Sequence, residues 1–335
     1  MEAVHIPVML DEVLSFLVPP REDALMVDCT LGEGGHAAAF LSRYPRLLYT
    51  GLDADPRIQA KARERLEPHA PRVEFRLGYY DELLAALAGE VEEAESSASA
   101  PAPESRKGRR PDLVLFDLGI SMHHYLEAGR GFGFNKDEAL DMRLSPDAPR
   151  GAADLVNHER EEELARIIFE YGEERYSRRI ARAIVDARKA GGIATSGRLA
   201  DVVAGAVPPA YRHGRIHAAT RTFQALRIAV NDELGRAERG IRRAASLLAP
   251  GGILAIISFH SLEDRIAKNV LRELAGRSTQ APDAPIGKEP EKAILELLTK
   301  KPLEPTAEEA ARNPASRSAK LRAARRIGPA GKAER

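Results

Sequence analysis

The sequence predicts an α/β protein built on a doubly wound parallel sheet, with a helical domain inserted into it. Three observations carry this prediction. Short apolar runs alternate with helical patterns up to residue 117, the alternation stops between residues 123 and 219, and it resumes afterwards. The length of 335 residues, with 44% hydrophobic and 30% charged residues, is typical of a folded chain with two domains or one domain carrying a large insertion.

The first half of the predicted sheet contains four strands. Each is a short apolar run that stops at polar residues, as a buried parallel strand does. We expect these strands at residues 25 to 30, 47 to 52, 73 to 77 and 113 to 116. Helices are expected at residues 37 to 43 and 56 to 67, the second opened by Pro56. Right-handed crossovers between such strands place ligands at the carboxyl ends of the strands.

The middle of the chain departs from this pattern. Residues 89 to 111 are rich in Ala, Ser, Pro and Glu without apolar periodicity, which indicates a flexible linker or surface loop. Residues 123 to 219 contain helical patterns, notably at 161 to 171 and 175 to 189, and no convincing strand. We therefore predict a discontinuous sheet domain, residues 1–122 and 220–335, and a helical insertion, residues 123–219.

The sheet resumes after the insertion. A long amphipathic helix is expected at residues 222 to 248, and residues 253 to 257 form a fifth buried strand. A further helix follows at residues 262 to 275. Residues 292 to 299 and 318 to 327 are candidates for a closing pair of strands.

A glycine-rich turn follows the first strand. Gly32, Gly34 and Gly35 let the backbone approach a ligand closely, and the N-terminus of the next helix adds unpaired N–H donors. Such a loop alone does not identify which ligand is bound. Gly32, Gly34 and Ala37 also fit the dinucleotide pattern, and Asp53 lies about 20 residues downstream, where a ribose hydroxyl would be bound. A nicotinamide cofactor therefore stays open on this evidence.

Polar residues at four strand ends favour S-adenosylmethionine instead. Asp28 precedes the glycines, while Asp53, Tyr80 and Asp117 follow the second, third and fourth strands. Together they would hold the amino acid, the ribose, the adenine and the reacting methyl group of that cofactor. The alternative is that acids at strand ends only cap the next helix.

Seven motifs in order along the chain make the prediction of function more specific. They are residues 5–12 (HIPVMLDE), 34–36 (GGH), 140–143 (LDMR), 171–175 (YGEER), 220–227 (TRTFQALR), 258–264 (SFHSLED) and 313–322 (NPASRSAKLR). With these motifs the chain resembles the MraW family over nearly its whole length. Members of this family are bacterial S-adenosylmethionine-dependent methyltransferases that modify N4 of a cytidine in the decoding region of 16S ribosomal RNA.

The resemblance implies a class I methyltransferase fold, S-adenosylmethionine as cofactor, and 16S ribosomal RNA or the small ribosomal subunit as partner. The cofactor contacts that it implies are Gly34, Gly35, His36, Asp53, Tyr80, Asp117 and the position held by His124. The family usually has Ser-Pro-Gln where this chain has Met-His-His at residues 122 to 124. An imidazole at position 124 can still donate or accept a hydrogen bond.

Methyl transfer asks little of the protein beyond holding the cytosine amine in line with the methyl group and excluding water. A hydrogen-bond acceptor for the amine N–H would also favour the nucleophilicity of the nitrogen and the specificity for it. The Asp/Asn-Pro-Pro-aromatic segment of many amino-methyltransferases is absent after the fourth strand. The candidate polarising residues are Asp117, Asp141, His260 and Ser261. The alternative for His260 is that it only orders its loop.

Two basic segments are candidates for RNA contact, although 50 Lys+Arg balance 50 Asp+Glu overall. Arg175, Arg178, Arg179 and Arg182 recur on one helical face, which would track phosphates. The alternative is a solvated face, or one paired with acids such as Glu170 and Glu174. Residues 312 to 335 carry eight basic residues against one acidic residue, which indicates either a mobile end or a nucleic-acid contact.

Composition and spacing exclude several other classes of protein. The single cysteine, Cys29, cannot close an intramolecular disulfide or form a cysteine zinc site. No apolar run approaches the ~18 residues that span a bilayer, and Asp11 and Glu12 stand where a signal peptide would not be acidic. We therefore expect a cytoplasmic protein. His213 and His217 have the spacing of a helical zinc pair, but no carboxylate at ligand spacing joins them, so no metal site is expected.

Two rival functions stay open. A nicotinamide oxidoreductase shares the glycine loop but gives no reason for the basic C-terminal segment. A non-catalytic RNA-binding or assembly factor with a degenerate cofactor pocket is suggested by the change at residues 122 to 124. A homodimer is also left open.

Overall fold

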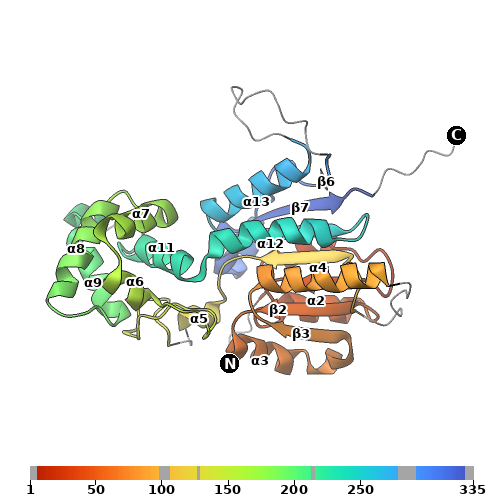
Figure 1. Ribbon diagram of the computed structural model, residues 1–335, viewed down its shortest axis with the longest axis horizontal. Coiled ribbons are helices and arrows are strands. Elements are labelled where there is room, and N and C mark those ends of the chain that lie inside the picture. Colours follow the sequence, from red (N-terminus) through yellow and green to blue (C-terminus); the bar gives the residue numbers. More distant parts are fainter. Residues whose placement is uncertain (1–5, 98–105, 127–128, 213–215, 278–291, 329–335) are drawn as a thin grey trace. The chain divides into compact units, whose positions relative to one another are not determined.

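A computed structural model describes residues 6–97, 106–126, 129–212, 216–277 and 292–328. The chain divides into two compact units. The sheet unit comprises Met1–Gly119 and Leu234–Arg335, and the helical unit comprises Ile120–Glu233. Figure 1 labels several elements of each unit. Within the described ranges, no helix is both long enough and apolar enough to cross a bilayer.

The sheet unit contains a seven-stranded sheet in the order β3-β2-β1-β4-β5-β7-β6. The strands are β1 Leu25–Asp28, β2 Leu48–Asp53, β3 Val73–Leu77, β4 Leu113–Asp117, β5 Ile253–Ser258, β6 Leu295–Leu297 and β7 Lys320–Arg326. Strands β1 to β5 pair in parallel, and β7 pairs antiparallel with both β5 and β6. The predicted doubly wound sheet is confirmed. Its order reverses between β1 and β4, and ligands bind at such a reversal in sheets of this kind.

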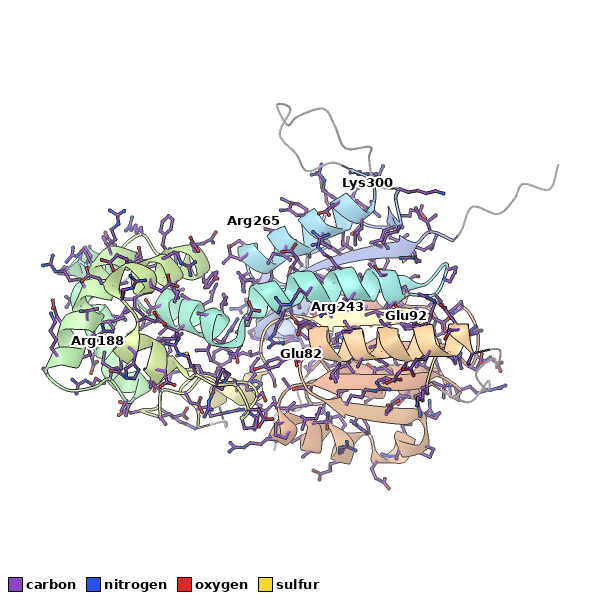
Figure 2. All side chains as sticks on the ribbon, viewed as in Figure 1. Glu82, Glu92, Arg188, Arg243, Arg265 and Lys300 are labelled. Carbon is purple, nitrogen blue, oxygen red and sulfur yellow. The ribbon has the colours of Figure 1, made fainter. Side chains whose placement is uncertain are left out.

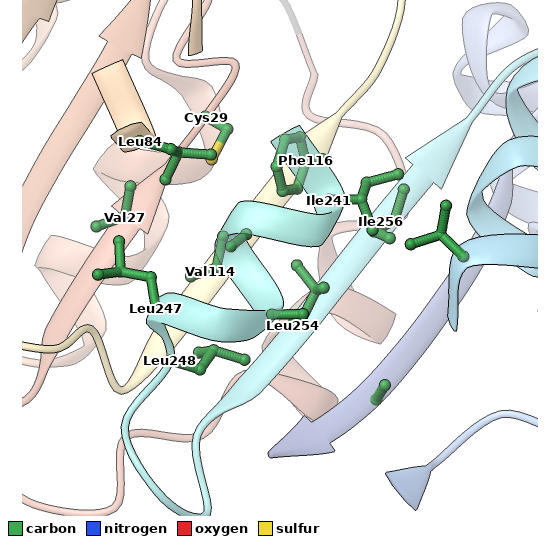
Figure 3. Packing of buried hydrophobic residues seen from close by; sticks show 14 of the residues in the cluster. Val27, Cys29, Leu84, Val114, Phe116, Ile241, Leu247, Leu248, Leu254 and Ile256 are labelled. Atoms are coloured by element: carbon green, nitrogen blue, oxygen red, sulfur yellow. The ribbon is translucent and has the colours of Figure 1, made fainter. Parts of the chain in front are cut away.

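Helices cover both faces of this sheet. They are α1 Leu10–Phe16, α2 Gly35–Arg43, α3 Pro56–Arg65, α4 Tyr80–Ser96, α12 Glu233–Leu247, α13 Ser261–Leu274 and α14 Ala307–Arg312, with short 3₁₀ helices at Glu67–Arg72 and Pro314–Ser318. Val27 and Phe116 pack on one face against α4, α12 and α13 (Figure 3). Met26 and Leu115 pack on the other face with residues of α1, α2 and α3. Successive strand residues point to opposite faces, so these apolar strands are buried on both sides.

The helical unit has its own core. Its helices are α5 Met122–Leu126, α6 Ala152–His158, α7 Glu161–Gly172, α8 Ser177–Lys189, α9 Ser196–Ala206, α10 Pro209–Arg212 and α11 Thr220–Asn231. Leu164, Ile180 and Phe223 are among the residues buried between them. Arg188 of α8, labelled in Figure 2, donates from Nη1 to the backbone oxygens of Val156 and Glu159 at 2.9 and 2.8 Å. These bonds hold α8 against the end of α6.

The predicted linker at residues 89 to 111 is wrong in its first part, because α4 continues to Ser96. Leu84, Leu87 and Val91 recur at helical spacing and are buried. The Ala and Glu residues that follow are good helix formers, so the helix extends past its buried stripe. Residues 98–105 lie outside the described residues. Arg109 donates to the backbone oxygen of Asp23 at 2.9 Å, so the end of this segment is attached to the sheet unit.

The single helix predicted at residues 222 to 248 is also wrong, since the chain breaks at Asp232, whose φ is +49°. Helix α11 ends at Asn231 and α12 begins at Glu233. The Asn231 side chain accepts from the Leu144 amide at 2.8 Å and donates to the backbone oxygen of Met142 at 2.8 Å. Its bonds thus belong to the helical unit. That unit consequently includes α11 and runs from residue 120 to 233, beyond the predicted limits of 123 and 219.

Part of the basic C-terminal segment is a strand of the sheet. Strands β6 and β7 lie within the two predicted closing strands. Residues 320–326 of the basic segment are therefore strand residues and not a mobile end. Arg322 forms a two-bond pair with Asp264 at 2.7 and 3.1 Å, and Arg326 donates to the backbone oxygen of Ala245 at 2.8 Å. These charges are used inside the fold. Residues 329–335 lie outside the described residues.

Candidate active site at the carboxyl edge of the sheet

The loop between β1 and α2 is built on glycines. Gly34 has φ +76° and caps α2, which begins at Gly35. A Cβ on Gly35 would lie 2.9 Å from Cγ of Pro7, so only glycine fits beneath that residue. The amide of Gly32 donates to Asp53 Oδ2 at 2.9 Å, which ties the loop to the end of β2.

Two carboxyl groups stand at the ends of β1 and β2, that of Asp28 buried and that of Asp53 half-buried. Asp28 accepts from the Tyr49 hydroxyl at 2.8 Å and from the Thr30 amide at 3.1 Å. Asp53 accepts from the Asp55 amide at 2.8 Å as well as from the glycine loop. Burial raises the pKa of both Asp28 and Asp53 to about 6, because a desolvated carboxylate loses its hydration.

Asp117 ends β4, next to β1. Its amide donates to the Thr30 hydroxyl at 2.6 Å, and its Oδ2 lies 3.7 Å from Nδ1 of His36. Its Oδ1 is buried without a hydrogen-bond partner among the described residues. Burial, reinforced by the negative charges of Asp28 and Glu263, raises the pKa of Asp117 well above its usual range. Oδ1 is therefore an acceptor that no donor of the described residues uses.

The group formed by Asp28, Asp53 and Asp117 fits S-adenosylmethionine. The sulfonium of that cofactor is a cation, and its amino group and ribose hydroxyls are hydrogen-bond donors. Asp117 Oδ1 offers a buried acceptor, and each oxygen of Asp53 keeps a second lone pair beyond its backbone bond. Three neighbouring carboxyl groups would repel the pyrophosphate of a nicotinamide dinucleotide, so the charge favours the sulfonium cofactor.

Tyr80 stands at the first position of α4, after β3. Its ring meets the Phe116 ring edge-on at 5.4 Å between centroids. A Cβ on Gly240 of α12 would lie 2.7 Å from the Tyr80 ring, so glycine leaves room for that ring. The structure thus brings Tyr80 into the sheet unit's core beside β4, while its cofactor contact stays a prediction.

His260 and Ser261 follow β5. His260 caps α13, with Nδ1 accepting from the Glu263 amide at 3.4 Å, and Glu263 Oε2 accepts from the Phe259 amide at 2.8 Å. This geometry supports the alternative interpretation of His260, namely ordering of the loop. Ser261 is exposed in the first turn of the helix.

Sequence reasoning missed Glu263, which is buried and contributes to the pKa of Asp117. Its spacing of three residues from His260, as in a capping box, was the signal.

Asp141 and His124 lie in the helical unit. Asp141 Oδ2 accepts from Arg143 Nη2 at 3.2 Å, so its charge is compensated locally. His124 is buried on α5, with its ring 5.0 Å from that of Phe132. The roles assigned to both residues stay predictions.

No group of three or more His, Cys, Asp or Glu side chains suited to a metal ion occurs in the described part of the chain. His213 lies outside the described residues. The ring of His217 packs against that of Phe134, with 4.5 Å between centroids.

The buried carboxyl group of Asp28 gives a prediction on stability. The folded state holds its proton more tightly than the unfolded state, since the pKa rises from 3.8 to about 6. Its contribution therefore favours folding below pH 4 and is lost as the pH rises to 6, a difference of about 3 kcal/mol. Asp28→Asn removes the titrating group. We therefore expect the difference in the free energy of unfolding, pH 7 minus pH 4, to be larger in the variant than in the wild type, as measured by urea denaturation. The same change at exposed Asp11 serves as the control, and an equal pH dependence in both variants would contradict the assignment.

Known proteins of similar sequence identify the family of this chain. The sequence model of the MraW methylase family matches residues 2–327. A protein of Treponema denticola, named ribosomal RNA small subunit methyltransferase H, is 50% identical over 327 residues, 98% of each chain. Proteins of the same name from Heliobacterium mobile and Treponema pallidum are 46% and 42% identical, covering 98% and 95% of this chain and 100% and 91% of their own. From this match over nearly its whole length, the chain belongs to the MraW methylase family.

Proposed function

We propose that this protein transfers a methyl group from S-adenosylmethionine to N4 of a cytidine in the decoding region of 16S ribosomal RNA. The observation that carries the proposal is Oδ1 of Asp117, which has no hydrogen-bond partner in the described parts of the chain, at the sheet edge where β1 and β4 meet. The names of the relatives supply the substrate class. We place the activity in the cytoplasm, and a homodimer stays an expectation that analytical ultracentrifugation would test.

The cofactor, when bound, supplies a methyl group already activated by its sulfonium. The protein's part is to bind and orient. The glycine loop lets the backbone of Gly34 and Gly35 approach a ligand, and Asp53 would accept hydrogen bonds from ribose hydroxyls. Asp117 would hold a donor at its free Oδ1. A carboxylate there also suits the developing positive charge on the amine nitrogen as it gains the methyl group.

We propose that the helical unit binds the RNA through the exposed arginines Arg175, Arg178, Arg179 and Arg182. The nearby acids are engaged elsewhere. Glu170 pairs with Arg166. Glu174 is completely buried and accepts from the Tyr176 amide at 2.8 Å and the Tyr211 hydroxyl at 2.6 Å. The basic face is thus left available for phosphates.

Aromatic rings adjoin this basic face. The guanidinium of Arg175 lies 4.9 Å from the Tyr176 ring centroid and 5.0 Å from that of Tyr211. Guanidinium planes and aromatic rings are the surfaces on which bases of single-stranded RNA stack. An exposed loop therefore fits this surface better than a duplex, in keeping with a cytidine that has to leave its stack to react.

Removing charge from this face should weaken RNA binding. We expect the double variant Arg178→Gln, Arg182→Gln to lower affinity for the RNA and to reduce the slope of log affinity against log salt by roughly 0.7 for each lost phosphate contact. S-adenosylmethionine affinity, measured by calorimetry, should not change. The control is Lys300→Gln, Lys301→Gln, which removes two exposed charges from the sheet unit. If both double variants give the same salt slope, the α8 face does not bind the RNA.

The proposed activity is tested by incubating the protein with labelled S-adenosylmethionine and small ribosomal subunits, followed by mass mapping of the modified nucleosides. N4-methylcytidine at one decoding-region position is the expected product. RNA and cofactor binding without transfer would support the assembly-factor alternative. Calorimetric binding of a nicotinamide dinucleotide in place of S-adenosylmethionine would support the oxidoreductase alternative.

A further inference from the structure

The segment at residues 6–9, just before α1, lies against the glycine loop. Pro7 packs over Gly35, because a Cβ added to that glycine would lie 2.9 Å from the Cγ atom of Pro7. The next residue, Val8, has its backbone oxygen 3.0 Å from Nε2 of His36, and both residues are buried. The segment therefore contacts the first two residues of α2, directly after the glycine loop.

This contact identifies one protonated ring nitrogen of His36. A carbonyl oxygen only accepts hydrogen bonds, so Nε2 of His36 carries a hydrogen and donates it to Val8. The other ring nitrogen, Nδ1, is then the one directed at Asp117, with 3.7 Å to Oδ2. The backbone of residue 8 thereby sets both the position and the tautomer of the imidazole beside Asp117.

Two side chains from the far end of the sequence hold the segment in place. Glu309 Oε1 accepts from the Met9 amide at 2.6 Å, and Asn313 Nδ2 donates to the Ile6 backbone oxygen at 3.1 Å. Glu309 and Asn313 are buried to 9% and 8% exposure, so water does not compete for these bonds. Asn313 is in turn fixed by the hydroxyl of Ser316, which donates to its backbone oxygen at 2.8 Å.

Met9 itself needs such support. Its φ of +52° and ψ of +38° place a non-glycine residue in the left-handed region, and its side chain is fully buried. This conformation costs about 1–2 kcal/mol and persists only when the surroundings impose it. The Glu309 bond to the Met9 amide is a contact from outside the segment that stabilises this conformation.

We propose that Glu309 and Asn313 are positioning residues of the active site, acting through residues 6–9 on the imidazole of His36. The inference rests on the proposed function, since His36 belongs to the candidate cofactor site. It gives a common role to the N-terminal motif at residues 5–12 and the C-terminal motif at residues 313–322, which contact each other through Asn313 and Ile6.

The test compares Glu309→Leu with Glu309→Gln. The amide oxygen of Gln still accepts from Met9, whereas Leu leaves that buried amide without an acceptor. For the Leu variant we expect the ¹⁵N resonances of His36 to move from one tautomer toward a mixture, and kcat to fall on the order of tenfold or more. The Gln variant should keep the wild-type spectrum and rate. Glu308→Leu, at an exposed position of the same helix, is the matched control.

A double-mutant cycle with His36→Gln separates positioning from simple destabilisation. If Glu309 acts through His36, Glu309→Leu should lower kcat no more than about twofold in the His36→Gln background. If the two residues act independently, Glu309→Leu should lower kcat there by the same factor as in the wild-type background. Full additivity, or an unchanged His36 spectrum in a folded Glu309→Leu protein, overturns the proposal. Should that variant not fold, Asn313→Ala removes one amide and is judged by the same criteria. The spectra need no RNA substrate, so failure of the proposed function would be recognised separately.

Discussion

Replacing Asp117 by asparagine should weaken S-adenosylmethionine binding by about 1.5–3 kcal/mol and lower turnover by a smaller factor that saturating cofactor does not restore. Asparagine keeps the size and one oxygen but loses the negative charge that a sulfonium would meet. Burial, and after it the charges of Asp28 and Glu263, raises the pKa of Asp117, so a bound cation stabilises its negative charge more here than at an exposed acid. The two effects are separated by calorimetry and by single-turnover rates at saturating cofactor.

The division between these two effects identifies the role of Asp117. Turnover that recovers fully at saturation means that the residue contacts only the cofactor. Turnover that stays low means that it also orients or polarises the cytosine amine, because an interaction made only in the transition state has been lost. Wild-type affinity together with wild-type turnover would remove Asp117 from the site and leave Asp141 and His260 as the next residues to test.

Asp53→Ala should weaken S-adenosylmethionine by roughly 1–3 kcal/mol, the value of a lost hydrogen bond to a charged group. The variant loses the proposed ribose acceptor and also the bonds to the amides of Gly32 and Asp55. Asp53→Asn keeps one oxygen and should lose less. A cofactor analogue without ribose hydroxyls distinguishes the two contributions, because its affinity should fall only by the part due to the loop. An equal loss for cofactor and analogue would contradict ribose binding by Asp53.

The strands of the sheet could be predicted because parallel strands buried on both faces are continuous apolar runs. The runs that end at Asp28, Asp53 and Asp117 are those that meet at the carboxyl edge, so the candidate site followed from the same pattern. The contact of Val8 with His36 could not be predicted, since a backbone oxygen leaves no sign in the sequence.

The errors have a related cause. The break at Asp232 depends on bonds from Asn231 to Met142 and Leu144, residues distant in sequence, and hydrophobic periodicity does not detect such tertiary contacts. The end of α4 was mistaken for a linker because its last turns bury little apolar surface, although their composition favours a helix. The capping role of His260 also depends on its backbone geometry, and its catalytic role stays a prediction.

The insertion of the helical unit between β4 and α12 has a consequence for the order of folding. Strands β4 and β5 pair in parallel, so their union has to close a loop that contains the whole unit. Loop-closure entropy grows only logarithmically with length, by about 0.6 kcal/mol for each doubling, and a loop that is already compact costs less than a flexible one. Helix–helix contacts within the unit are more local than strand pairing across it and should form faster. Pulse-labelling hydrogen exchange during refolding would then show amides of α7 and α8 protected before those of β5.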